Sequence, residues 1–191
     1  MKPVFLILAF ASFTLAAAGQ ISFRASESSE ELIEGGTCHT LVVDAGREHL
    51  VTRLPRGYAA TVDNQAQSVV FKEGTGSIAI TMQVTTNSPG QLPDDDTLRT
   101  NALAINPNEN FLQISTCATG YKPARFVDSI HSQDRFRSIR TRHAFVPCPE
   151  GTVEFIFSSK DEDFDKGRVV FNLFLSSFRV EMIQEPAKPP G

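Results

Sequence analysis

The densest group of side chains that could do chemistry in this sequence is basic. Arg135 and Arg137 alternate along one predicted strand, followed by Arg140 and Arg142. Arginine forks suit carboxylates and phosphates, so the group predicts a binding site for an anion or an acidic partner. Its members are Lys122, Arg125, Arg135, Arg137, Arg140 and Arg142, which we call the basic stripe.

The geometry of a strand limits what the basic stripe can do. Neighbouring side chains point to opposite faces, so the first arginine pair and the second face opposite sides. All four line one face only if the strand bulges near residues 138–139. The alternative is a solvated stripe on the wet face of an antiparallel sheet, and no glycine-rich phosphate cradle accompanies it.

Two acidic runs resemble metal-binding loops only in part. Asp161–Gly167 places carboxylates at alternate positions, but its glycine comes one residue late and Asn172 stands where a calcium loop needs glutamate. The acids instead suit the N-terminus of a helix, and Asp94–Asp96 has the same interpretation. We therefore predict no metal site.

A nucleophilic enzyme site is not predicted either. Cys38 and His39 are adjacent in a predicted strand and point to opposite faces, and no G-x-S-x-G elbow is present. His49, His131 and His143 are scattered singly. We expect a protein without catalytic residues or a cofactor.

The three cysteines allow three single disulfides. Cys117 and Cys148 follow the first and third strands of a predicted up-down-up meander, so both fall at one edge of the sheet. Two strand spacings separate them by about 10 Å, whereas a disulfide needs Cα atoms within about 7 Å. If both lie in loops beyond the strands, that gap can close. We expect a Cys117–Cys148 disulfide, with Cys38 as the free thiol.

The elements that must position these residues are mostly short strands. β-type runs separated by turn residues occur at 40–43, 50–54, 68–71, 78–86, 111–116, 124–130, 135–146 and 152–158. Leu98, Ala102 and Ile105 recur at helical spacing, and residues 164–174 form a second amphipathic segment. Strands grouped between single helices predict an α+β fold with an antiparallel β-sheet covered by helices.

Three short motifs connect this order to a known fold. The first is an early turn at Pro55–Tyr58. The second is a step into the meander at Pro123–Arg125, and the third is a strand after the last helix at Ser176–Val180. With these motifs, residues 48–181 resemble the PsbP/Mog1/DcrB-like superfamily of α/β/α sandwiches. The resemblance implies a non-enzymatic binding or assembly module with no catalytic residues. The chain departs from the family in lacking Trp, so Tyr58 supplies the aromatic of the early turn.

The N-terminus has the pattern of an export signal. Lys2 precedes an apolar run from Val4 to Leu15, and small residues follow to Gly19. We predict a signal peptide at 1–19, a flexible lead-in at 20–36, a single α+β domain at 37–182 and a disordered tail at 183–191. The apolar run is too short for a stable anchor, so an exported protein, periplasmic or extracellular, is expected.

Charge and composition narrow the choice of partners. The net charge of −4 becomes −5 once the segment with Lys2 is removed, which argues against nucleic-acid binding. We expect an exported binding or assembly module that recognises a protein or other macromolecule through a sheet face. Two alternatives are a carrier of a small apolar ligand, roofed by the Phe-rich C-terminal helix, and a hydrolytic or metal-dependent enzyme.

Overall fold

The computed structural model describes residues 23–31, 36–74, 78–85, 91–92, 94–105, 109–134 and 137–183. The signal peptide predicted at 1–19 and residues 184–191 of the predicted tail lie outside these ranges. Within them the chain forms eleven strands and two α-helices, α1 (Asp95–Ile105) and α2 (Phe164–Ser177). Neither helix is long and apolar enough to cross a bilayer.

The described strands pair into two antiparallel sheets. The four-stranded sheet has the order β1-β2-β3-β11, and the seven-stranded sheet has the order β4-β5-β6-β10-β9-β8-β7. Their bounds are β1 (Phe23–Glu31), β2 (Thr37–Ala45), β3 (Glu48–Arg53), β4 (Tyr58–Asp63), β5 (Ser68–Glu73), β6 (Ala79–Thr85), β7 (Glu109–Cys117), β8 (Ala124–Asp134), β9 (Arg137–Cys148), β10 (Gly151–Lys160) and β11 (Arg179–Met182).

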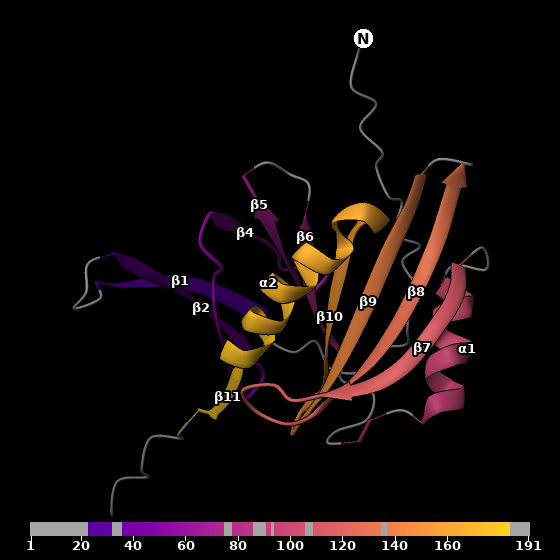
Figure 1. Cartoon of the computed structure of the whole chain (residues 1–191). Coiled ribbons are helices and arrows are strands. Elements are labelled where there is room, and N and C mark those ends of the chain that lie inside the picture. Colours follow the sequence, from indigo (N-terminus) through magenta and orange to yellow (C-terminus); the bar gives the residue numbers. More distant parts are fainter. Residues whose placement is uncertain are drawn as a thin grey trace, which may run out of the picture.

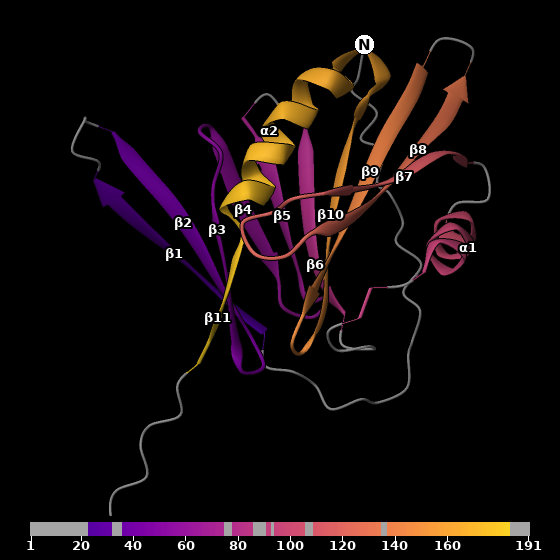
Figure 2. The same cartoon turned by 60° about the horizontal axis from the view of Figure 1, so that its bottom comes forward.

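The helices lie on opposite faces of the seven-stranded sheet. Phe126 of β8 packs toward α2, with its ring centroid 6.2 Å from that of Phe171. The next side chain along the strand, Arg125, points to the other face and pairs with Asp95 of α1. Figure 1 shows α1 beside β7 and β8, and Figure 2 shows α2 in the opening between the two sheets. The predicted α+β fold with a helix-covered antiparallel sheet is confirmed.

Phenylalanine rings fill the space between α2 and the sheet. Val153, Phe155 and Phe157 alternate along β10 and are fully buried, as the period of two predicted. Phe174 of α2 meets Phe155 edge to face at 5.6 Å, and Phe171 stacks on Phe157 at 5.4 Å. Each such side chain contributes about 1.5–3 kcal/mol of burial free energy. The aromatic face of α2 therefore serves the core.

The flexible lead-in predicted for residues 20–36 is wrong for residues 23–31, which form β1. This strand is mostly polar and exposed, but it pairs with β2 over its full length, from Phe23 opposite Ala45 to Glu31 opposite Thr37. Backbone pairing to β2 holds the strand. Of its side chains, only Phe23 and Ala25, near its start, pack on the core. Composition alone does not reveal such an edge strand.

The predicted Cys117–Cys148 disulfide is also wrong, because all three cysteines are free. The two residues are the last of β7 and β9, not part of loops beyond them, and β8 runs between these strands. Two strand spacings of about 4.8 Å exceed the reach of a disulfide. The Cys148 thiol instead donates to the Val146 carbonyl at 3.8 Å.

Candidate functional site

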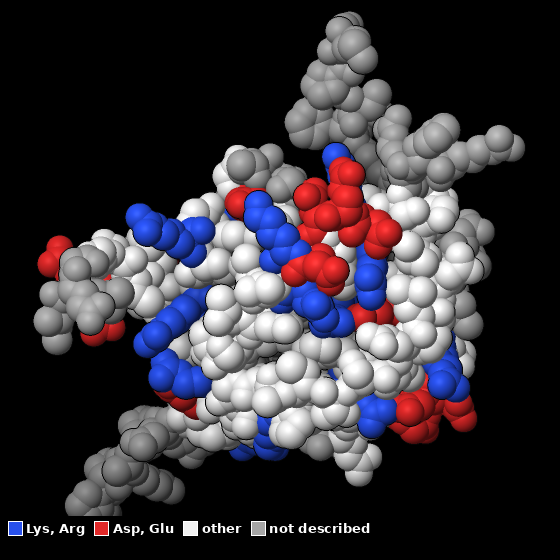
Figure 3. Space-filling view, viewed as in Figure 1, with Lys and Arg blue, Asp and Glu red and all other residues white. Residues whose placement is uncertain are grey.

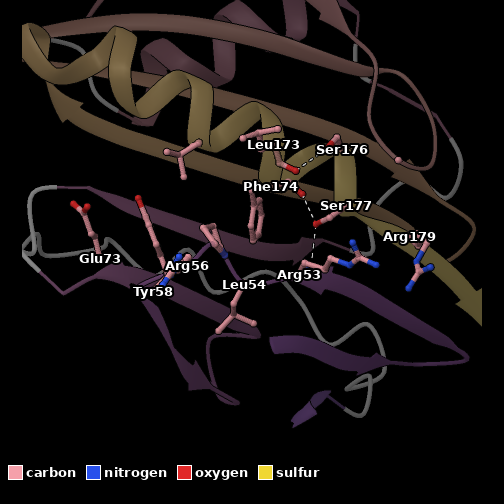
Figure 4. A pocket seen from close by; sticks show the side chains of 13 residues that line it. Arg53, Leu54, Arg56, Tyr58, Glu73, Leu173, Phe174, Ser176, Ser177 and Arg179 are labelled. Atoms are coloured by element: carbon pink, nitrogen blue, oxygen red, sulfur yellow. Dashed lines mark hydrogen bonds between the residues drawn. The ribbon is translucent and has the colours of Figure 1, made fainter. Parts of the chain in front are cut away.

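A cleft of about 630 Å³ opens beside the C-terminal half of α2 (Figure 4). We call it the α2 cleft. Four separate parts of the chain line it: the end of β3 with the turn into β4, the end of β5, the loop from β7 to β8, and α2 with the start of β11. The lining residues are Arg53, Leu54, Pro55, Arg56, Tyr58, Glu73, Gly120, Val170, Leu173, Phe174, Ser176, Ser177 and Arg179.

The hydroxyl of Ser177 fixes one wall of the cleft. It accepts a hydrogen bond from the Arg53 backbone N–H at 3.0 Å and donates one to the Phe174 carbonyl at 2.7 Å. The last turn of α2 is thereby attached to the end of β3. This contact places the arginine of β3 and the apolar residues of α2 on opposite sides of one opening.

Gly120 fixes the second wall through a close approach that no other residue permits. Its N–H donates to the Leu175 carbonyl at 3.0 Å. A Cβ atom at this position would lie 2.4 Å from the Ser176 carbonyl oxygen and 2.6 Å from that of Phe178. The β7–β8 loop can therefore reach the end of α2 only with glycine here.

The turn from β3 to β4 forms the third side. The Tyr58 N–H donates to the Pro55 carbonyl at 3.0 Å, and Gly57 has φ of +82°, a conformation that favours glycine. This turn places Arg56 and Tyr58 in the lining of the cleft (Figure 4). Burial, with a smaller effect of the Glu73 carboxylate, raises the pKa of Tyr58 to about 12. The phenol therefore stays protonated near neutral pH. It can donate and accept hydrogen bonds but cannot act as a base.

The α2 cleft combines positive charge with an apolar strip. Arg53, Arg56 and Arg179 are exposed, and none of them has a carboxylate partner among the described residues. Leu54 and Phe174 face each other across the opening, and Leu173 on the rim is 66 % exposed (Figure 4). Three guanidinium groups thus surround a hydrophobic floor, with Glu73 supplying one carboxylate.

The predicted basic stripe does not form one surface. Arg142 is buried, and its Nε and Nη2 atoms each lie 2.6 Å from an oxygen of Asp128, which has no exposed surface. Arg140 reaches the same carboxylate at 3.8 Å and packs over the Phe164 ring at 4.2 Å. These two arginines therefore balance a buried acid under the first turn of α2, and the prediction of an exposed site is wrong for Arg142.

The remaining members of the stripe are dispersed. Arg125 lies on the other face of the sheet, paired with Asp95. Lys122 is exposed, with its ammonium 5.1 Å from the Tyr121 ring centroid. Arg137 begins β9, and Arg135 lies outside the described residues. The pairing of β8 with β9 has a register shift, and it falls between Ser132 and Asp134 of β8.

Both acidic runs lie at helix N-termini, as interpreted from the sequence. Asp161–Asp163 form a short 3₁₀ turn ahead of α2, and acids gather over this end of the helix in Figure 3. Asp94 accepts the Thr97 N–H at 2.8 Å, and this hydrogen bond is the main cause of the lowered pKa of Asp94. The part of the chain that the structure describes holds no group of three or more metal-ligating side chains.

Two of the three short sequence motifs contribute residues to the lining of the α2 cleft. The motif at 55–58 supplies Pro55, Arg56 and Tyr58 to the lining, and the motif at 176–180 supplies Ser176, Ser177 and Arg179. The residues of these two motifs therefore meet in space around one opening, whereas the third motif, Pro123–Arg125, does not line it.

Comparison with known proteins identifies the fold. The sequence matches no protein-family model and is not detectably similar to any curated protein. The solution structure of cyanobacterial PsbP (CyanoP) from Synechocystis superposes with a TM-score of 0.52 at 11 % identity, over 88 % of this chain and 98 % of that one. The chain has the PsbP-like fold. The expectation from the three motifs is confirmed at this level.

Two further solved structures are more distant. A protein from Bacteroides thetaiotaomicron has a TM-score of 0.44 at 12 % identity over 74 % of this chain, which spans 47 % of that protein's length. LpqN of Mycobacterium tuberculosis, a protein involved in cell envelope biogenesis, has a TM-score of 0.41 at 10 % identity over 82 % of this chain and 91 % of that one.

Proposed function

We propose that this PsbP-like protein is an exported, non-catalytic binding module that holds an acidic, partly apolar segment of a protein partner in the α2 cleft. The observation that carries this proposal is the set of three exposed arginines, without carboxylate partners among the described residues, around an apolar floor. The export component comes from the pattern of residues 1–19.

The chemistry of the lining selects the kind of segment. Guanidinium forks bind carboxylates in pairs of hydrogen bonds, and such pairs strengthen when the surroundings exclude water. Leu54, Phe174 and Leu173 supply that exclusion for an apolar side chain next to the acids. Arginine and tyrosine are also the residues that most often dominate binding energy at interfaces. A volume of about 630 Å³ accommodates a few side chains of a partner.

The arginines and the tyrosine of the cleft favour binding over catalysis. Arginine does not release its proton in proteins, and Tyr58 with a pKa of about 12 does not act as a base near neutral pH. Phe171 and Phe174 of α2 pack against β10, and the opening that Phe174 also lines is bordered by arginines, whereas a lipid carrier needs an enclosed apolar pocket.

The test is a selection of short random peptides displayed against the protein, followed by affinity measurements. We expect enriched peptides that combine acids with an apolar residue. The triple variant Arg53→Ser, Arg56→Ser, Arg179→Ser should lose at least about tenfold in affinity, which corresponds to about 1.4 kcal/mol.

A second triple variant provides the matched control. Lys160→Ser, Lys166→Ser and Arg168→Ser remove the same charge at the other end of α2, where the side chains are exposed. Its affinity should stay within about twofold of the wild type, since long-range charge effects are screened by salt. Equal losses in both variants, or enrichment without acids, would contradict the proposal.

A further inference from the structure

β4 is an edge strand of the seven-stranded sheet and starts at the α2 cleft. It pairs with β5 alone, in a regular register from Tyr58 opposite Glu73 to Asp63 opposite Ser68. Its first residue, Tyr58, lines the cleft. Any strand added to this edge would therefore lead directly into the opening.

The other described edges carry features that discourage strand addition, and β4 does not. β1 holds several charged residues, β11 has only four residues, and the register of β7 shifts between Phe111 and Gln113. Charge, short length and bulges are the usual means by which edges avoid pairing. β4 reads Tyr-Ala-Ala-Thr-Val-Asp, with no proline or bulge and no charge before its last residue.

The backbone of β4 presents free hydrogen-bonding groups outward. The Gly74 N–H donates to the Gly57 carbonyl at 3.1 Å, so the alternation of an antiparallel ladder directs residues 59, 61 and 63 toward β5. The N–H and C=O groups of Ala60 and Val62 then point away from the sheet. No other backbone in the described part of the chain bonds to them.

The side chains of β4 leave room for a neighbouring strand. Ala59 and Thr61 are small and exposed on one face, and Val62 is 37 % exposed on the other. The end of the strand at Tyr58 lies beside the three arginines of the α2 cleft, whereas the other end carries Asp63. A charged partner segment would therefore place its acidic end at Tyr58 and avoid like charge at Asp63.

We propose that the partner binds by strand addition: an extended segment pairs with β4 as an eighth strand, and its acidic end enters the α2 cleft. This inference rests on the proposed function and adds the mode of binding. Main-chain hydrogen bonds to Ala60 and Val62 hold the segment, and the arginines select its charge. Either strand direction satisfies the geometry as long as the acids lie beside Tyr58.

The probe is a synthetic peptide of alternating valine and threonine with a run of glutamates at one end. Its binding at up to millimolar concentration is followed by amide hydrogen exchange and by fluorescence anisotropy. Saturation should slow exchange of the Ala60 and Val62 amides at least about tenfold, because both become hydrogen-bonded. The amides of Ala59 and Thr61, already bonded to β5, should change little.

Two modifications test the pairing directly. Ala60→Pro removes an outward N–H, which an edge strand tolerates, and should weaken binding at least about tenfold while Ala59→Ser does not. Two N-methylated peptides, modified on alternate residues along one edge or the other, remain decisive if the proline variant fails to fold. Only the set whose methyl groups face β4 should lose affinity.

The outcomes separate this inference from the proposed function. If the peptide binds in an arginine-dependent way but exchange at Ala60 and Val62 is unchanged, strand addition is wrong and the cleft proposal stands. If the peptide with lysines in place of glutamates binds equally well, the cleft proposal fails. If these amides are already protected without peptide and the protein sediments as a dimer, β4 pairs with a second copy and the inference is overturned. Absence of all binding would overturn both proposals.

Discussion

Replacing Arg142 with methionine would test the buried ion pair under the first turn of α2. The substitution keeps most of the side-chain stem but removes the guanidinium, which lies over the rings of Phe126 and Phe164 and makes both hydrogen bonds to Asp128. The carboxylate of Asp128, which has no exposed surface, would keep one hydrogen bond from Gln113 at 3.2 Å.

The size of the effect follows from burial. Removing one partner of a buried ion pair costs about 3–5 kcal/mol, because the other charge stays in a poorly solvating environment. Arg140, whose Nη2 is 3.8 Å from the same carboxylate, can move closer and compensate in part. We therefore expect a loss of about 3 kcal/mol in unfolding free energy. The double variant Asp128→Leu, Arg142→Met removes both charges and should lie within about 1–2 kcal/mol of the wild type.

The assay is urea unfolding followed by far-ultraviolet circular dichroism, since the chain has no tryptophan to report by fluorescence. Arg125→Met is the matched control. Its ion pair with Asp95 is 31 % and 50 % exposed and should contribute less than about 1 kcal/mol. If Arg142→Met costs no more than Arg125→Met, the Asp128 carboxylate reaches water in solution and the reasoning is refuted.

Three further predictions address the cleft and the thiols. Gly120→Ala should lower the unfolding free energy by about 1–3 kcal/mol, because its Cβ meets backbone carbonyls, whereas Gly74→Ala, with its nearest atom 3.9 Å away, should be close to neutral in the same urea assay. The raised pKa of Tyr58 means that its protonated form favours the folded state. This contribution to stability is complete below pH 10 and is lost as the pH rises toward 12. The melting temperature of Tyr58→Phe should therefore fall less steeply between pH 10 and 12 than that of the wild type. Burial raises the pKa of the Cys148 thiol to about 12, so iodoacetamide at mildly alkaline pH should modify it only after unfolding, and peptide mapping that recovers a Cys117–Cys148 disulfide would refute the assignment of free thiols.

Strands that bury their own side chains were predictable from the sequence, and strands held by pairing were not. β10 is recognisable from Val153, Phe155 and Phe157, because apolar residues with a period of two are a local signal of a strand. β1 has no such signal, because its residues are polar and its order depends on the register with β2. Composition therefore misassigned an edge strand as a flexible segment.

The site shows a similar limit. The sign of the charges near Arg142 suggested an exposed surface, but the carboxylate that neutralises this arginine comes from the neighbouring strand, opposite it in register at Asp128. The α2 cleft depends on contacts between distant segments, such as the Arg53 N–H with the Ser177 hydroxyl, 124 residues apart. The motifs at 55–58 and 176–180 were visible in the sequence, but only the folded structure shows that they lie around the same cleft.

The order of the four-stranded sheet has a consequence for how the chain folds. Its strands β1, β2 and β3 come from the beginning of the domain, and β11, which pairs along β3 from Arg179 opposite Val51, comes last. During synthesis the outer edge of β3 must stay unpaired until residue 182 has emerged. Pairing between strands that are far apart in the sequence is slow. The four-stranded sheet, and with it the native state, can therefore be completed only after β11 has been synthesised. A chain that ends at Phe178 would contain α2 but leave this side of the sheet open.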